Sequence, residues 1–466
     1  MLLSINSEDR FMKREKLGSR LGFILLSAGC AIGIGNVWKF PYMVGQNGGG
    51  LFVLLYLFFL VILGLPVMTM EFAIGRGSQK SPVRIYHQLT PNKKKWRAHG
   101  YIAFAGSYLI MMFYTTVAGW MLHYFVSTAT GTFDGADSTQ ITETFNGMLS
   151  DPGSMVLYMA IVVLAGFLVC SLGLQKGLER VTKFMMIALL GIMVLLALYS
   201  IFVIDGKEGL AFYLVPNLEN VEKVGIFNVI VGAMNQAFFT LSLGIGCMAI
   251  FGSYIGKERS LLGESINVAV LDTFVAITSG LIIFPTCSAF NVEVDSGPSL
   301  IFVTLPNLFN SLPGGMIWGS LFFVFMSFAA LSTVLAVFEN IISCTIDMLN
   351  CSRRKACIIN GVLMFVLSLP CALGFNLLSG ITPFGEGSTI MDLEDFLVSN
   401  IILPLGSLCY VIFCVTKYGW GWKNFKAEAN TGKGAKIHNW MRGYMTYVLP
   451  VIILVIFALG IYNFFK

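Results

Sequence analysis

About eleven long apolar stretches dominate this chain and decide what it can fold into, since a helix needs about 20 mostly apolar residues to cross a bilayer. The chain has 466 residues, of which 56% are hydrophobic and only 12% charged, whereas about a quarter are charged in soluble domains. We expect helices, because lipid offers no partner to unpaired backbone groups. The short alternating segments of a membrane barrel are not found in the sequence. The stretches cover residues 20–44, 49–75, 98–130, 154–173, 181–204, 226–255, 262–286, 316–349, 356–375, 393–416 and 443–465.

The loops between these stretches alternate between basic and acidic. Lys and Arg gather before the first stretch and after the second, fourth, sixth, eighth and tenth, whereas the loops 127–153 and 287–315 contain acids and no Lys or Arg. Positive loops stay in the cytoplasm. We therefore expect a multi-pass protein of the cell (inner) membrane, with a cytoplasmic N-terminal segment at 1–19, a flexible cytoplasmic loop at 417–442 and an external C-terminus. The net charge of +5 reflects this topology and does not indicate a nucleic-acid partner.

Two stretches carry the same glycine pattern near their middle. Gly33-Ile34-Gly35 lies in the first and Gly244-Ile245-Gly246 in the sixth. Glycine in a membrane helix can simply allow close packing. The matched positions, the polar neighbours and Pro41 favour breaks in both helices instead, and such breaks in two halves of a chain indicate the binding site of an inverted-repeat transporter. Freed N–H groups suit a carboxylate, and freed carbonyls suit a small cation.

Longer motifs resemble the neurotransmitter:sodium symporter family over nearly the whole chain. They are Gly29-Cys30-Ala31-Ile32-Gly33-Ile34-Gly35-Asn36-Val37-Trp38-Lys39-Phe40-Pro41, Asn47-Gly48-Gly49-Gly50, Glu71-Phe72-Ala73-Ile74-Gly75-Arg76, Gln236-Ala237-Phe238-Phe239-Thr240-Leu241-Ser242-Leu243-Gly244, Ala329-Ala330-Leu331-Ser332-Thr333 and Asp392-Leu393-Glu394-Asp395-Phe396. The chain is most similar in character to the prokaryotic branch, which includes leucine, tyrosine and hydrophobic amino-acid transporters.

The resemblance implies an all-α membrane protein with two inverted five-helix repeats, at 20–204 and 226–416, and an eleventh helix at 443–466. Helices 1 and 6 would be unwound in mid-membrane. The implied activity is sodium-coupled symport of an amino acid into the cell by alternating access, and not an enzymatic reaction.

The resemblance also implies a substrate site. Backbone groups of Ala31, Gly33, Ile34 and Gly35 would bind the amino-acid head group, and the Tyr114 hydroxyl would bind its carboxylate. The positions that match the family's side-chain pocket are Ile110, Phe239, Thr240, Ser242, Ile245, Thr333 and Val337. Because Ile245 and Val337 are aliphatic, and burying an unpaired polar group costs several kcal/mol, we expect a neutral, hydrophobic or aromatic substrate.

Two sodium ions are implied, each held by hard oxygen ligands. The first site would use the Ala31 carbonyl, Asn36, Thr240 and Asp272, joined by the substrate carboxylate. The ligands of the second site would be the carbonyls of Gly29, Ile32 and Ala329 and the hydroxyls of Ser332 and Thr333. In an ordinary helix, those hydroxyls would bond to a carbonyl one turn back.

The family's chloride pocket maps to Tyr56, Gln236, Thr240, Asp272 and Ala276. Chloride-dependent members have serine at the position of Ala276 and commonly asparagine at that of Asp272. An acid inside a membrane is costly and therefore usually functional. We expect Asp272 to replace the anion, so that chloride is not required.

Two gates are implied as well. Lys39 and Asp395 match the outer pair, where lysine lacks the bidentate fork of the arginine in most bacterial relatives. Arg14 and Asp347, with Ser253 and Tyr254, match the inner gate, although a solvated surface pair would look the same in sequence. Glu71 is expected to be a structural acid, and Glu339 has no assigned role.

Other functions remain as alternatives. A proton-coupled amino-acid carrier of the same fold would lack the paired hydroxyls of Ser332 and Thr333. A membrane-embedded enzyme would need convergent catalytic groups, but none of the four histidines lies in mid-stretch. The expected partners are the lipid bilayer and a small amino acid; one copy should suffice for transport, and a homodimer remains open.

Overall fold

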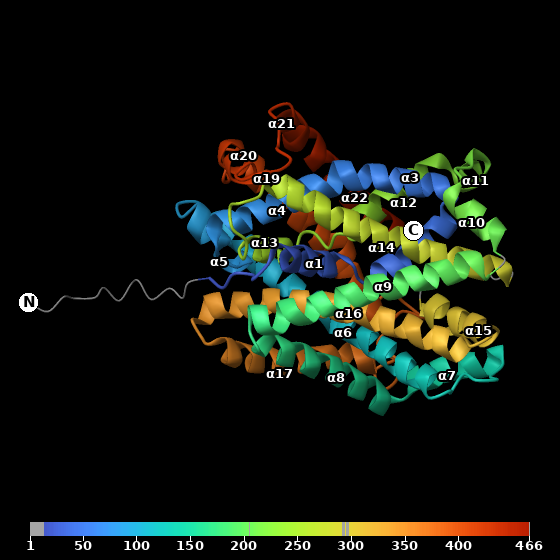
Figure 1. Cartoon of the computed structure of the whole chain (residues 1–466). Helices are drawn as coiled ribbons and strands as arrows, with labels where there is room; N and C mark the ends of the chain where they lie inside the picture. The colour runs from blue at the N-terminus through green and yellow to red at the C-terminus, as the bar shows by residue number, and fades with distance from the viewer. Residues whose placement is uncertain (1–13, 205, 291–293, 295–297, 466) are drawn as a thin grey trace, which may run out of the picture.

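The computed structural model describes residues 14–204, 206–290, 294 and 298–465 of a single helical bundle. Arg10, Lys13, Glu293 and Asp295, which contributed to the predicted topology, lie outside this part of the chain. The long helices run side by side, with α5 and α20 at one end of the bundle and α7, α10, α11 and α15 at the other (Figure 1). The segment that follows α4 and the segment that precedes α22 therefore lie at the same end of the bundle. Both are rich in Lys and Arg, and the predicted topology placed them on the same side of the membrane.

Nine helical segments among the described residues are long and apolar enough to cross a membrane. A tenth span is the bent pair formed by α1 (Arg20–Ala31) and the helix Gly35–Gln46, whose C-terminal part is α2 (Phe40–Gln46). The predicted sixth stretch contains α12 (Ile226–Phe239) and α13 (Cys247–Gly252), with no helix between them. The nine are Gly50–Ser78 (α3, Gly50–Phe59, and α4, Leu65–Ser78), Lys94–Ala129 (mostly α6, Arg97–Ala129), α8 (Pro152–Ser171), Leu174–Phe202 (mostly α9, Arg180–Phe202), α14 (Leu261–Ala289), α16 (Gly315–Leu349), α17 (Arg353–Leu373), Ile390–Val415 (α18, Ile390–Phe396, and α19, Leu403–Val415) and Met441–Tyr462 (α21, Met441–Gly443, and most of α22, Leu449–Phe464).

Short helices cover both ends of the bundle. Their bounds are α5 (Pro82–Leu89), α7 (Ser138–Ser150), α10 (Lys207–Leu214), α11 (Leu218–Val224), α15 (Leu305–Asn310) and α20 (Trp422–Ala429). Local sequence explains where several helices begin. Asp137 caps α7 in a capping box with Gln140, and Asp151 accepts N–H bonds at the start of α8, where Pro152 takes the first helical position.

Residues 417–442, expected to form a flexible loop, instead fold against the bundle. Helix α20 packs on α4 through the side chain of Arg76, which is 1% exposed. Its guanidinium donates to the Glu428 carboxylate at 2.6 Å and to the Arg259 carbonyl at 2.7 Å. A backbone bridge between Arg259 and Lys433 fastens the same segment. The glycines of this segment form turns between packed elements, so composition alone suggested flexibility wrongly.

We predict that Arg76→Gln destabilises the protein by about 3–5 kcal/mol, because it leaves the Glu428 carboxylate without its buried partner. The measurement is thermal unfolding of the purified protein. Lys95→Gln, at an exposed position of the neighbouring loop, is the control and should leave the unfolding temperature unchanged. Equal melting of both variants and the parent would contradict the assigned role of the pair.

Candidate functional site

The first helix break exposes backbone amides that donate to two side chains, one from the same span and one from α6. Helix α1 ends at Ala31, and the helix that continues from Gly35 is bent from it by 58°. The Gly33 amide donates to Asn36 Oδ1 at 3.2 Å, and the Ile34 amide donates to the Tyr114 hydroxyl at 3.1 Å. A Cβ at Gly33 would lie 2.6 Å from that hydroxyl, so the close approach of α6 requires glycine here.

The second break depends on glycine for backbone conformation. Gly244 and Gly246 have φ of 102° and 80°, in the left-handed region that side chains disfavour, and the non-glycine Ser242 also has a positive φ of 49°. The freed Gly244 amide donates to Glu71 Oε1 at 2.6 Å. Glu71, expected to be structural, therefore caps the broken segment from α4.

A cavity of about 340 Å³ lies between the two breaks and α6. Most of the predicted substrate residues line it, while Ile245 and Val337 do not. Both of these side chains are buried, and Ile245 packs toward Gly106 on α6, so their place in a substrate pocket stays a prediction. The lining is Cys30, Ala31, Gly33, Ile34, Gly35, Asn36, Trp38, Lys39, Ile110, Phe113, Tyr114, Val117, Phe239, Thr240, Ser242, Pro298, Thr333, Met391, Asp392, Asp395, Val398, Ser399 and Leu403.

Three residues predicted for the first sodium site converge at one side of this cavity. Asn36 Nδ2 donates to Asp272 Oδ1 at 2.8 Å and to Thr240 Oγ1 at 3.2 Å, and Thr240 donates to Asp272 Oδ2 at 3.1 Å. All three are buried. The Asn36 carbonyl is fixed in turn by the Ser279 hydroxyl at 2.7 Å. The fourth predicted ligand, Ala31, borders the same cavity.

The five groups predicted for the second sodium site also meet. The Ser332 hydroxyl lies 3.1 Å from the Gly29 carbonyl and 2.9 Å from that of Ala329. The Thr333 hydroxyl lies 3.1 Å from the Gly29 carbonyl and 3.2 Å from that of Ile32. These bonds run from α16 to the end of α1, so the hydroxyls do more than bond within their own helix. The oxygens form a buried cluster next to the break.

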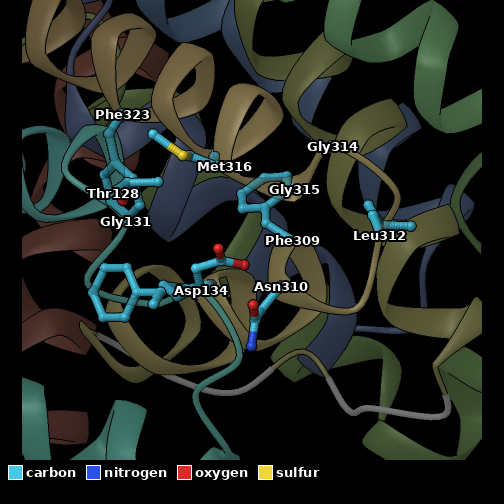
Figure 2. A pocket seen from close by; sticks show the side chains of 13 residues that line it. Thr128, Gly131, Asp134, Phe309, Asn310, Leu312, Gly314, Gly315, Met316 and Phe323 are labelled. Atoms are coloured by element: carbon cyan, nitrogen blue, oxygen red, sulfur yellow. The ribbon is translucent and has the colours of Figure 1, made fainter.

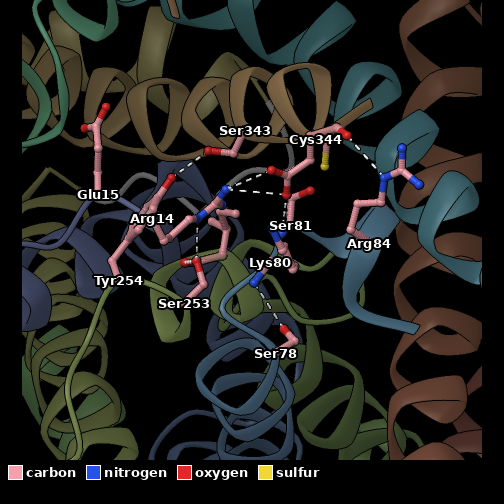
Figure 3. A network of polar contacts seen from close by, with 12 residues as sticks. Arg14, Glu15, Ser78, Lys80, Ser81, Arg84, Ser253, Tyr254, Ser343 and Cys344 are labelled. Carbon is pink, nitrogen blue, oxygen red and sulfur yellow. Dashed lines mark hydrogen bonds and ion pairs between the residues drawn. The ribbon is translucent and has the colours of Figure 1, made fainter. Parts of the chain in front are cut away.

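The two predicted gates differ in whether their charged residues are paired. Arg14 lies 3.4 Å from Asp347, donates to the Ser253 hydroxyl at 3.2 Å and stacks over the Tyr254 ring, so the inner set is joined (Figure 3). At the other gate, Lys39 points its ammonium at the Phe239 ring, 3.7 Å from the centroid. Within the described part of the chain, Lys39 and Asp395 form no ion pair, although both line the cavity.

Glu339, which had no assigned role, joins the inner network. Its carboxylate pairs with Arg353 at the start of α17 and accepts bonds from the Tyr254 and Ser343 hydroxyls. Arg353 also lies 3.8 Å from Glu15. In the sequence, the one indication of this role was that Glu339 is an acid inside a predicted span. Its role was not predicted further, because most residues that Glu339 contacts are distant in sequence.

A second, smaller hollow of about 160 Å³ lies beside α15 (Figure 2), at the end of the bundle opposite to α5 (Figure 1). Asn310 on α15 borders it, donates to the Ala136 carbonyl at 2.7 Å and accepts from the Gly135 amide. Asn310 thereby ties the loop before α7 to α15. None of the predicted site residues lines this hollow.

Comparison with known proteins identifies the family. The model of the sodium:neurotransmitter symporter family matches residues 14–148 and 139–466. The chain belongs to this family. Relatives are similar over nearly the whole chain: the chain is 33% identical to the sodium-dependent transporter YhdH of Bacillus subtilis, over 97% of this chain and 99% of that protein. The sodium-dependent serotonin transporter of Drosophila melanogaster is 24% identical over 97% of this chain and 77% of that protein.

A solved structure shows the same fold. The crystal structure of MhsT in complex with L-phenylalanine matches with a TM-score of 0.85 and 35% identity, over 96% of this chain and all of that chain. The predicted resemblance, the prokaryotic branch and the all-α membrane fold are thus confirmed. Family membership makes the protein a sodium-coupled transporter and not an enzyme.

Proposed function

We propose that the protein carries a neutral, hydrophobic or aromatic amino acid into the cell together with two sodium ions, without a requirement for chloride. The observation that carries this proposal is the cavity beside both helix breaks, where backbone amides and the Tyr114 hydroxyl face apolar walls and two oxygen clusters. The complex of MhsT with L-phenylalanine is consistent with such a substrate.

The amino-acid head group would bind at the first break. Tyr114 accepts the Ile34 amide, which leaves its own hydroxyl proton to donate to a substrate carboxylate. The walls formed by Ile110, Val117 and Phe239 are apolar. A polar substrate side chain placed against them would lose its water without finding partners, at a cost of several kcal/mol.

Sodium would bind in the two oxygen clusters, which supply carbonyl, hydroxyl, amide and carboxylate groups of the hard kind that such a cation needs. At the first cluster, the substrate carboxylate would complete the coordination by Asn36, Thr240 and Asp272. Substrate and ion would then each strengthen the other's binding, which is reciprocal coupling between two sites. At the second, an ion would exchange the hydrogen bonds of Ser332 and Thr333 for direct contacts.

Chloride would be replaced by the Asp272 carboxylate. Gln236 lies one turn before Thr240, and its buried side-chain amide makes no hydrogen bond in the described part of the chain. An unpaired buried amide can indicate an unseen water or ion. Removal of chloride is therefore a necessary test of this part of the proposal.

Alternating access would use the two gates. We propose that the Arg14 end faces the cytoplasm, with the C-terminus outside the inner membrane, and that the repeats 20–204 and 226–416 move against each other. The joined Arg14–Asp347 pair and the separate Lys39 and Asp395 side chains suit a carrier that is closed inside. One copy would suffice for transport, whether or not homodimers form.

The test is uptake into liposomes that contain the purified protein, with a panel of radiolabelled amino acids. We expect an inward sodium gradient to drive accumulation of at least one apolar amino acid, with equal uptake when gluconate replaces chloride. Uptake driven by a pH gradient without sodium would instead support the proton-coupled alternative. The absence of sodium-driven uptake of every amino acid would overturn the proposed substrate class.

A further inference from the structure

An apolar groove of about 630 Å³ runs between α8 and α17, on the outside of the bundle and apart from the transport site. Its walls include Leu164, Leu168, Ile358 and Val362, whose side chains are 59% to 69% exposed. Exposed aliphatic side chains on membrane helices face lipid. Gly361 lines the groove without a side chain, and a Cβ there would lie 3.5 Å from the Phe167 ring, an ordinary contact.

The groove has the length of one leaflet. Its lining runs from Ala160 to Ser171 on α8 and from Arg354 to Phe365 on α17. At 1.5 Å per residue, each wall is about 16 Å long. The hydrocarbon core of a bilayer is about 30 Å thick, so the groove accommodates an acyl chain from one side of the membrane.

A positive charge marks one end of the groove. Arg354 lines the groove where α17 begins, and no acidic residue lines it. The neighbouring Arg353 turns inward to Glu339 and the Cys170 carbonyl, whereas Arg354 is exposed and forms no ion pair among the described residues. Basic pockets between membrane helices suit anionic lipid head groups.

We propose that this groove is a binding site for an anionic phospholipid, with one acyl chain against Gly361 and the phosphate at Arg354. The site would lie in the cytoplasmic leaflet under the proposed orientation. It does not depend on which amino acid is carried. The apolar walls alone would accept any lipid, and Arg354 provides the preference for an anionic one.

The test is native mass spectrometry of the full chain after incubation with equal amounts of phosphatidylglycerol and phosphatidylcholine that share the same acyl chains. We expect preferential retention of phosphatidylglycerol. Arg354→Gln should reduce that preference about fivefold, since a basic residue near the head groups contributes about 1 kcal/mol. Arg180→Gln removes an exposed arginine that does not line the groove and is the matched control.

A second variant tests the acyl-chain part of the site. Gly361→Leu should fill the groove and reduce retention of both lipids, while Val366→Leu, at a lipid-facing position that does not line the groove, should not. Sodium-driven uptake by each variant checks that it is folded, and if Gly361→Leu fails to fold, Arg354→Gln alone decides. Equal retention of the two lipids, no effect of Arg354→Gln, or disulfide cross-linking of two copies through Ile358→Cys would overturn the proposal.

Discussion

Replacing Ser332 by Ala and Thr333 by Val together is expected to lower the apparent sodium affinity of transport by at least about 100-fold. Both hydroxyls lie between 2.9 and 3.2 Å from carbonyls at the end of α1 and on α16. A hydrogen bond or contact with a charged group contributes about 1.5–3 kcal/mol, so the loss of two such contacts to an ion amounts to about 3–6 kcal/mol. Each 1.4 kcal/mol is a factor of ten in affinity.

The measurement is uptake as a function of sodium concentration in liposomes. Ser320→Ala is the control, because Ser320 is on the same helix but bonds to the Met316 carbonyl one turn back. If the double variant keeps the sodium dependence of the parent, the cluster is only a set of hydrogen bonds between α1 and α16. A variant that is inactive at every sodium concentration should still unfold at the parent's temperature if the fold is intact.

Much of the fold was predictable because the membrane restricts the choice of structure. Apolar length and alternating loop charge gave helix positions close to those observed, such as 154–173 for α8 at Pro152–Ser171. The glycines of Gly244-Ile245-Gly246 mark a true break, since both have positive φ. The glycines of the first break have a different cause, which is close contact with other side chains: Gly33 lies against Tyr114 and Gly35 against Phe239. A sequence pattern does not distinguish the two causes.

The parts that were missed depend on distant contacts. The segment 417–442 looked like a loop, but the buried Arg76 holds α20 against α4. Glu339 and Arg353 are recognisable as a pair only once α16 and α17 are packed together. Motifs identify residue types that can serve a site, whereas burial and side-chain direction follow from tertiary packing.

Asp272→Asn is expected to lower the apparent sodium affinity by about 10- to 150-fold in chloride-free buffer. The Asp272 carboxylate is fully buried between Asn36 and Thr240. Its amide substitute keeps the size but removes the negative charge, and one charged contact contributes about 1.5–3 kcal/mol. The parent, by contrast, should transport equally well with chloride and with gluconate.

A second substitution separates loss of charge from loss of shape. If Asp272 serves in place of an anion, the pair Asp272→Asn with Ala276→Ser should regain sodium-driven uptake when chloride is added, because the serine hydroxyl and the Gln236 amide can then donate to the anion. Thr278→Val, on the same helix, is the control, since its hydroxyl bonds to the Phe274 carbonyl one turn back. Undiminished uptake by Asp272→Asn without chloride would show that the carboxylate is not needed for sodium binding. Recovery of uptake by the double variant in chloride would show that sodium-driven uptake needs a negative charge at this site and does not need the aspartate itself.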